Sequence, residues 1–157
     1  MGVKVTKSGP GLDGLRADLA RLMKSDVLVG IPAEKAMRKG SPINNASVLF
    51  IFTHGSPLRN QPPRPLLEPS IEKNKAAISA HMAAAARAIV VEKNAARGNR
   101  ELNLAGVVAV NGAKRFFLDN QWAPNAPSTI KRKKSDRPGV DLGIMRNALS
   151  WVVRERS

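Results

Sequence analysis

The sequence predicts an α+β fold, with a small and mostly antiparallel sheet flanked by an N-terminal helix and two long central helices. Three observations carry this prediction. Leucines recur at helical spacing near the N-terminus, two long alanine-rich segments fill the middle of the chain, and two short apolar runs rich in β-branched residues stand far apart. With 157 residues, 43% of them hydrophobic, the chain has the size of a single domain spanning 1–157.

The N-terminal part predicts one helix and one strand. Residues 12–24 form an amphipathic helix, because one stripe at helical spacing holds Leu12, Leu15, Leu19 and Leu22. The run 27–31 is rich in valine and ends at Pro32, which predicts a buried strand. The polar segment 33–44 then reads as a loop.

The next two segments differ in how clearly they can be assigned. The apolar run 47–52 fits either a strand or a short helix, and periodicity does not separate the two in so short a segment. Residues 55–69 contain five prolines, which fix φ and remove backbone donors. We therefore expect an extended, polyproline-like arm there, with Pro69 in the first turn of the following helix.

The centre of the chain predicts a helical hairpin. A helix is expected over 70–97, ended by Gly98, and a second over 100–119, although Gly106 and Gly112 lower its helix propensity. Small residues on both helices permit a close approach. Residues 120–140 again read as loop, and 148–155 as a final strand that can pair with 27–31 in one sheet.

The residue types that carry most enzyme chemistry are scarce. There is no Cys, and the two histidines His54 and His81 lack partners at ligand spacing. No pair of acids looks like a general acid/base couple, and no phosphate-binding glycine loop occurs. The sequence therefore predicts no catalytic site, no metal and no cofactor. The absence of a long apolar run predicts a soluble, intracellular protein without membrane contact.

The charge of the chain implies an anionic partner. Lys and Arg number 26 against 12 Asp and Glu, a formal net charge of +14. The densest basic cluster consists of Lys131, Arg132, Lys133, Lys134 and Arg137. This cluster is either a solvated loop or a contact with DNA or an acidic protein. A small basic nucleic-acid-binding protein is the alternative function, resting on charge alone.

A few further residues are candidates for contacts or for local structure. Arg64 and Pro65, inside the proline-rich segment, are candidates for contact with another subunit or with the chain itself, and Trp122 for either the core or an interface. Gly55 is expected at a turn, Asp141 as the cap of a turn at 142–148, and Gly143 within that turn.

Five segments, in this order, resemble the tail-completion and head–tail joining proteins of tailed bacteriophages, including the virion-morphogenesis proteins of Mu-like phages. They begin with VLVGIPAEK (27–35) and HGSP (54–57), the latter without the acid of the family's usual turn. The others are PRPLL (63–67), WAPNAPSTIKRK (122–133) and VDLGIMRNAL (140–149), where Leu142 replaces the family's Thr.

The resemblance implies a structural role in the virion. It implies a subunit of a ring, commonly of six copies, that joins the tail to the head connector or adaptor and contacts the tail tube or tail terminator. The location would be the neck of the virion, reached from the host cytoplasm during assembly, with nonspecific DNA contact open to the basic loop. Such proteins can remain monomeric until they meet their partner ring. The resemblance also favours a helix over 47–52.

Overall fold

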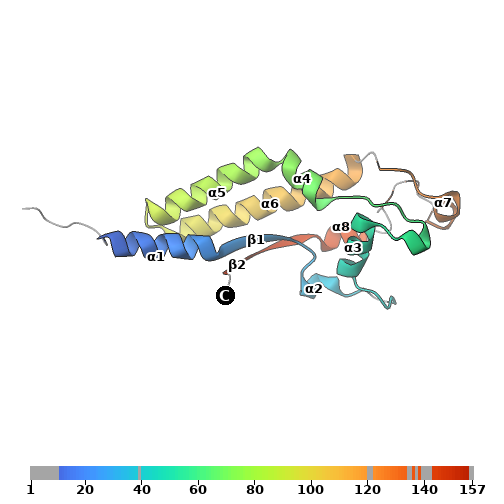
Figure 1. The fold of residues 1–157 in the computed structure, drawn as a ribbon, viewed down its shortest axis with the longest axis horizontal. Helices are drawn as coiled ribbons and strands as arrows, with labels where there is room; N and C mark the ends of the chain where they lie inside the picture. The colour runs from blue at the N-terminus through green and yellow to red at the C-terminus, as the bar shows by residue number, and fades with distance from the viewer. Residues whose placement is uncertain are drawn as a thin grey trace, which may run out of the picture.

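The protein is described by a computed structural model that covers residues 11–38, 40–119, 122–133, 136, 138 and 143–155. Figure 1 shows an elongated molecule with a helical hairpin along its length. The elements are α1 (Gly11–Lys24), β1 (Ser25–Gly30), α2 (Ala33–Ala36), α3 (Asn45–His54), a 3-10 turn (Pro57–Arg59), α4 (Leu67–Lys73), α5 (Lys75–Val90), α6 (Ala95–Asp119), α7 (Pro127–Lys133), α8 (Ile144–Ala148) and β2 (Ser150–Glu155). The predicted α+β class and its flanking helices are confirmed.

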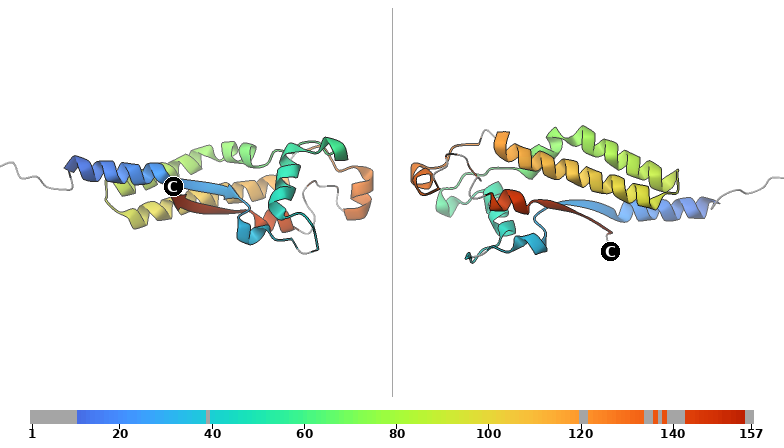
Figure 2. Two further views of the ribbon diagram at one scale, coloured as in Figure 1. Left: turned by 60° about the horizontal axis from the view of Figure 1, so that its bottom comes forward. Right: turned by 180° about the vertical axis from the view of Figure 1, so that it is seen from behind.

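The sheet consists of β1 and β2, which pair antiparallel with Leu28 opposite Val152. Successive side chains of a strand point to opposite faces. Val29 and Trp151 pack toward the core on one face, beneath α6, whereas Leu28 and Val152 lie on the other face and are 41% and 42% exposed. The left view of Figure 2 shows this second face uncovered, so the sheet is buried on one side only.

The hairpin of α5 and α6 approaches its neighbours closely where α6 carries glycine. A Cβ on Gly98 would lie 2.3 Å from Cγ1 of Ile89 on α5, and a Cβ on Gly106 would lie 2.3 Å from Cδ1 of Trp151 on β2. The glycines that lower the helix propensity of this segment thus permit its packing.

The predicted helix over 70–97 is wrong in its extent. It is interrupted at Asn74, whose side chain donates to the carbonyl of Ser70 at 2.7 Å and so competes with the backbone. The helix ends at Val90, and α6 starts after Asn94, whose Oδ1 accepts from the N–H of Arg97 at 2.9 Å. This is the geometry of an asparagine N-cap, so Gly98 lies inside α6 rather than at a helix end.

The main core lies at the end of the molecule that holds α3 and α8. It is formed by Leu49, Phe52, Leu66, Val110, Ala113, Phe117, Met145 and Leu149. The ambiguous run 47–52 is part of helix α3, as the resemblance favours. Asn44 caps this helix by accepting from the N–H of Ser47 at 2.8 Å.

The predicted loops contain more structure than expected. The proline-rich segment folds back on its own chain: Ser56 and Gln61 form a β-bridge, and the N–H of Arg64 donates to the carbonyl of Phe52 at 3.0 Å. Within the predicted extended segment, Pro62, Pro63 and Pro65 are exposed, whereas Arg64 and Leu66 are buried against the domain. Short helices also interrupt the other two segments, α2 within 33–44 and α7 within 120–140.

Candidate interaction surfaces

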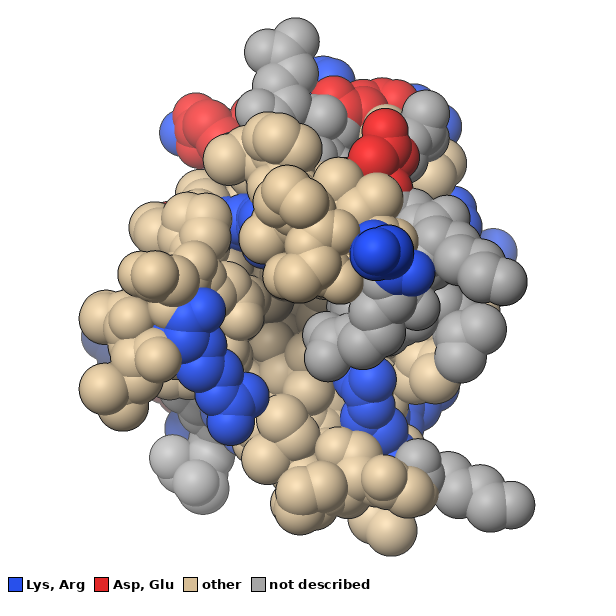
Figure 3. Space-filling model, turned by 90° about the vertical axis from the view of Figure 1, so that its right-hand side faces the viewer, with Lys and Arg blue, Asp and Glu red and all other residues tan. Residues whose placement is uncertain are grey.

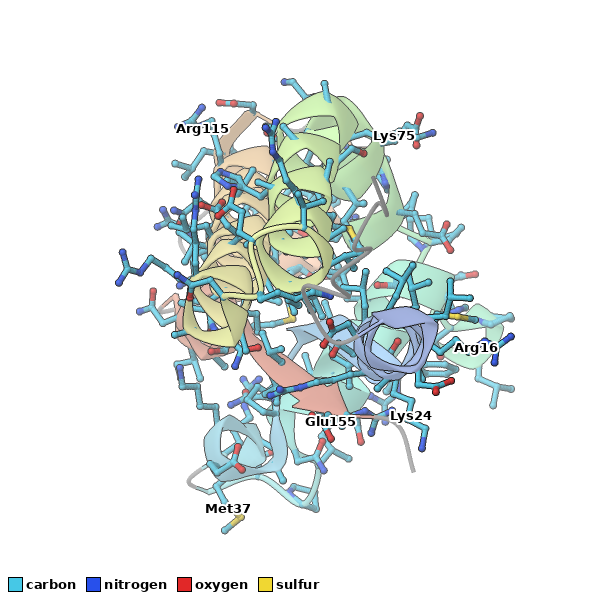
Figure 4. All side chains as sticks on the ribbon, turned by 90° about the vertical axis from the view of Figure 1, so that its left-hand side faces the viewer. Arg16, Lys24, Met37, Lys75, Arg115 and Glu155 are labelled. Carbon is cyan, nitrogen blue, oxygen red and sulfur yellow. The ribbon has the colours of Figure 1, made fainter. Side chains whose placement is uncertain are left out.

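The first candidate surface is the apolar stripe of α1, formed by Leu12, Leu15, Leu19 and Met23 and called here the α1 surface. None of the 14 residues of α1 is buried by the described part of the chain. Leu12 and Met23 are 74% and 73% exposed. Figure 4 views this end of the molecule, where α1 lies beside the sheet and the labelled Arg16 and Lys24 point away from the hairpin.

Ion pairs join α1 to the turn before α6 and to β2. Nζ of Lys93, in the turn before α6, donates to Asp18 at 2.5 Å, and Nε of Arg21 lies 3.6 Å from Glu155 on β2. Beside α1, each strand of the sheet has only one partner strand among the described residues. Both strands are thus edge strands, the kind of strand to which a neighbouring chain can add another.

The second candidate surface is a hollow of about 680 Å³ at the opposite end of the molecule, called here the arginine basin. Its walls come from α3, the hairpin 59–62, the segment 124–126 with the start of α7, and the single residues Arg38, Ser41, Ile43, Arg64 and Met145. Three arginines line it, Arg38, Arg59 and Arg64, and none of the described lining residues is acidic. Figure 3 shows this hollow, with Lys and Arg side chains on its sides.

Among the three arginines of the basin, Arg64 is the one whose guanidinium is fixed by hydrogen bonds to another described segment. It is 7% exposed, and its Nη2 donates to the carbonyls of Ala123 and Pro124 at 3.1 and 3.4 Å. Its guanidinium carbon lies 5.8 Å from the ring centre of Phe52, within the range of a cation–π contact. Burial lowers the pKa of Arg64 from its usual value, because the charged form loses hydration. Its Nε has no hydrogen-bond partner among the described residues.

Trp122 lies behind Arg64, in the aromatic part of the core. Its ring packs edge-on against Phe52 and Phe117, with ring centres 5.0 and 5.9 Å apart, and tilts against Phe116 at 5.8 Å. Arg64 and Trp122 thus make contacts within the chain, which is one of the two roles predicted for each.

The remaining predicted residues differ in their exposure and in the elements that hold them. Pro65 and Lys131 are exposed, Arg132 and Lys133 belong to α7, and Lys134, Arg137 and Asp141 lie outside the described residues. The two predicted turn glycines have left-handed backbones. Gly55 has φ +79° and would place a Cβ 2.7 Å from the carbonyl of Gln61, and Gly143 has φ +66° at the N-cap of α8.

The histidines make local contacts. Nδ1 of His54 lies 3.0 Å from the carbonyl of Phe50, and Nδ1 of His81 lies 2.8 Å from Oε2 of Glu101, which joins α5 to α6. Across the described residues, no three His, Cys, Asp or Glu side chains gather as a metal site would require. No described helix combines the length and apolarity needed to cross a membrane.

Two features of these surfaces cannot be predicted from the sequence. Arg38 and Arg59 join Arg64 only through the fold, because they come from separate loops and carry no motif. The stripe on α1 predicts a helix that buries its leucines, yet a pattern cannot say whether the surface that covers them belongs to the same chain.

Comparison with known proteins identifies no relative: no family model, no curated protein and no solved structure matches this chain. The resemblance to tail-completion proteins therefore stays a prediction that rests on its five segments.

Proposed function

We propose that this chain is a structural subunit of a tailed-bacteriophage particle, one copy of a ring at the junction of head and tail. It acts through shape and contact rather than through catalysis. In such a ring, each copy covers the apolar surface of the next, and the ring as a whole joins the tail to the head connector.

The observation that carries this proposal is the exposure of the α1 surface. Leu12, Leu19 and Met23 form one face of a helix, and their exposed fractions are 74%, 41% and 73%. Exposed apolar side chains gathered on one face mark a surface that a partner covers. The open edges of a two-stranded sheet lie beside this helix and can add a strand from a neighbour. The five segments shared with tail-completion proteins favour a ring of identical copies as that partner.

Complementation tests the proposal. Disruption of the gene in the phage or prophage that encodes it is expected to leave filled heads and separate tails, and the wild-type chain supplied in trans restores joined, infectious particles. The variant Leu12→Ser/Leu19→Ser/Met23→Ser is expected to fold, as judged by circular dichroism, and to fail in complementation.

A matched control separates the α1 surface from exposed apolar residues in general. Met37, Leu58 and Val91 are 85%, 101% and 70% exposed and lie outside α1. Their triple serine variant is expected to restore infectivity. Normal particles without the gene, or equal failure of both triple variants, would contradict the proposal.

The rival function, nonspecific nucleic-acid binding, is favoured only by the net charge of +14. It predicts an affinity for duplex DNA that falls steeply as salt rises, because bound cations are released from the phosphates. Association through the apolar α1 surface is expected to persist in high salt, since apolar burial is not screened.

A further inference from the structure

We propose that the arginine basin binds a short acidic segment of another protein, in which one or two carboxylates flank an apolar side chain. The inference does not depend on the ring, because the basin lies at the end of the molecule opposite to α1 (Figure 1).

The charge of the basin selects an anion. Arg38, Arg59 and Arg64 line it, and no acid occurs among the lining residues that the structure describes. Arg64 is only 7% exposed. Its Nη2 donates to two backbone carbonyls, whereas its Nε has no hydrogen-bond partner among the described residues. Nε of Arg64 is itself shielded from solvent, so the groups that a carboxylate in the basin can pair with are the guanidinium groups of Arg38, which is half-buried, and Arg59, which is exposed.

The wall of the basin selects an apolar group as well. Val48, Ile51, Phe52 and Met145 line the hollow between the arginines, so an occupant that carries charge alone would leave this surface in contact with water. A peptide with an apolar side chain between carboxylates can cover the apolar part of the wall and pair with the arginines at the same time.

The same wall argues against nucleic acid as the occupant. The phosphates of a duplex lie on a convex, highly charged cylinder, and the protein contacts to them come from exposed basic side chains. The basin is instead concave and partly apolar, and its best-held arginine is buried. Nucleic acid is therefore better matched by exposed cations elsewhere, such as Lys131.

The composition of the chain argues for a different protein rather than a second copy. Asp and Glu number 12 against 26 Lys and Arg. Several of these acids are already paired within the chain, such as Asp18 with Lys93 and Glu92 with Arg97. The counter-charge for three further arginines is expected from a more acidic partner.

The test is a selection of peptides on the purified full chain. A random dodecapeptide display library is selected on the wild type, on Arg38→Gln/Arg59→Gln and on Arg115→Gln. Arg115 is exposed on the outer side of α6, where Figure 4 labels it, and controls for loss of charge outside the basin. Arg64 is left intact, because its contacts hold the fold together.

The proposal expects the wild type and Arg115→Gln to enrich peptides that combine acidic with apolar residues, and Arg38→Gln/Arg59→Gln to lose that enrichment. A fluorescent copy of the consensus peptide is expected to bind the basin variant about 10-fold more weakly, as loss of charge-assisted hydrogen bonds implies, and the control within about 2-fold. The affinity of a 16-base-pair DNA duplex is expected to change equally little in both variants.

Three outcomes would overturn the proposal: no acidic consensus on the wild type, the same consensus on the basin variant, or selective loss of duplex binding by that variant. Thermal unfolding of all three proteins shows whether the variants are folded. Both variants are expected to fold, because Arg38 is half-buried and Arg59 and Arg115 are exposed.

Discussion

The two ends of the molecule use their apolar residues in opposite ways. At the basin end, Phe52 and Phe117 are 5% and 0% exposed, and Arg64 is held over this packed core by its hydrogen bonds to Ala123 and Pro124. At the α1 end, Leu12 and Met23 are 74% and 73% exposed, and ion pairs join Asp18 to Lys93 and Arg21 to Glu155. The basin end therefore contains the main core cluster, whereas the α1 end carries apolar side chains that the described part of the chain leaves exposed.

The largest expected effect separates the two ends directly. Phe117→Ala removes a fully buried ring from the core and is expected to lower the free energy of unfolding by about 3–5 kcal/mol. Leu12→Ala, on a side chain that is 74% exposed, is expected to change it by less than about 0.5 kcal/mol. Urea denaturation of the monomer measures both, and similar losses would contradict the comparison.

A pair of glycines tests how closely α6 packs against β2 and against Asn74. A Cβ on Gly106 would clash with Cδ1, Cγ and Cβ of Trp151, so Gly106→Ala is expected to lower the free energy of unfolding by about 1–3 kcal/mol.

Gly112→Ala is the matched control. Its Cβ meets chiefly the amide end of Asn74, which can move, and alanine gains up to about 1 kcal/mol in helix propensity. We expect little net change in the melting temperature. A loss equal to that of Gly106→Ala would show that the side of α6 facing Asn74 excludes a side chain as strictly as the side facing Trp151.

A smaller effect is expected where Arg64 holds the basin. Lys cannot reproduce the fork that donates to the carbonyls of Ala123 and Pro124, so Arg64→Lys is expected to lose about one hydrogen bond, about 0.5–1.5 kcal/mol. Urea unfolding gives the value. An unchanged stability would mean that these hydrogen bonds do not form in solution.

The smallest effect is expected at the other end. Lys93→Ala removes the ion pair with Asp18 that holds α1, and a partly exposed pair contributes about 0.2–1 kcal/mol. The loss is expected to shrink in 1 M salt, which screens the pair. Faster hydrogen exchange confined to α1 would confirm the local effect, and faster exchange throughout α6 would contradict it.

The sequence predicts those parts of the structure that depend on residues close together in the chain. The leucine stripe of α1, the valines of β1 and Gly55 act through neighbouring residues, and their elements are confirmed. The break at Asn74 was not predicted, because it depends on one side chain that donates to Ser70 within an otherwise helical pattern. Asn94 is an N-cap signal that the alanine-rich pattern conceals. The arginine basin was out of reach, since three separate segments bring Arg38, Arg59 and Arg64 together.

The central claim, that copies of this chain cover the α1 surface of their neighbours in a ring, is tested most directly by cryo-electron microscopy of the purified particle's neck, with the symmetry tested rather than imposed. The account predicts a ring of this chain between head and tail, with Leu12, Leu19 and Met23 buried against the adjacent copy. A particle that lacks the chain, or a ring in which these three side chains face solvent, would contradict it.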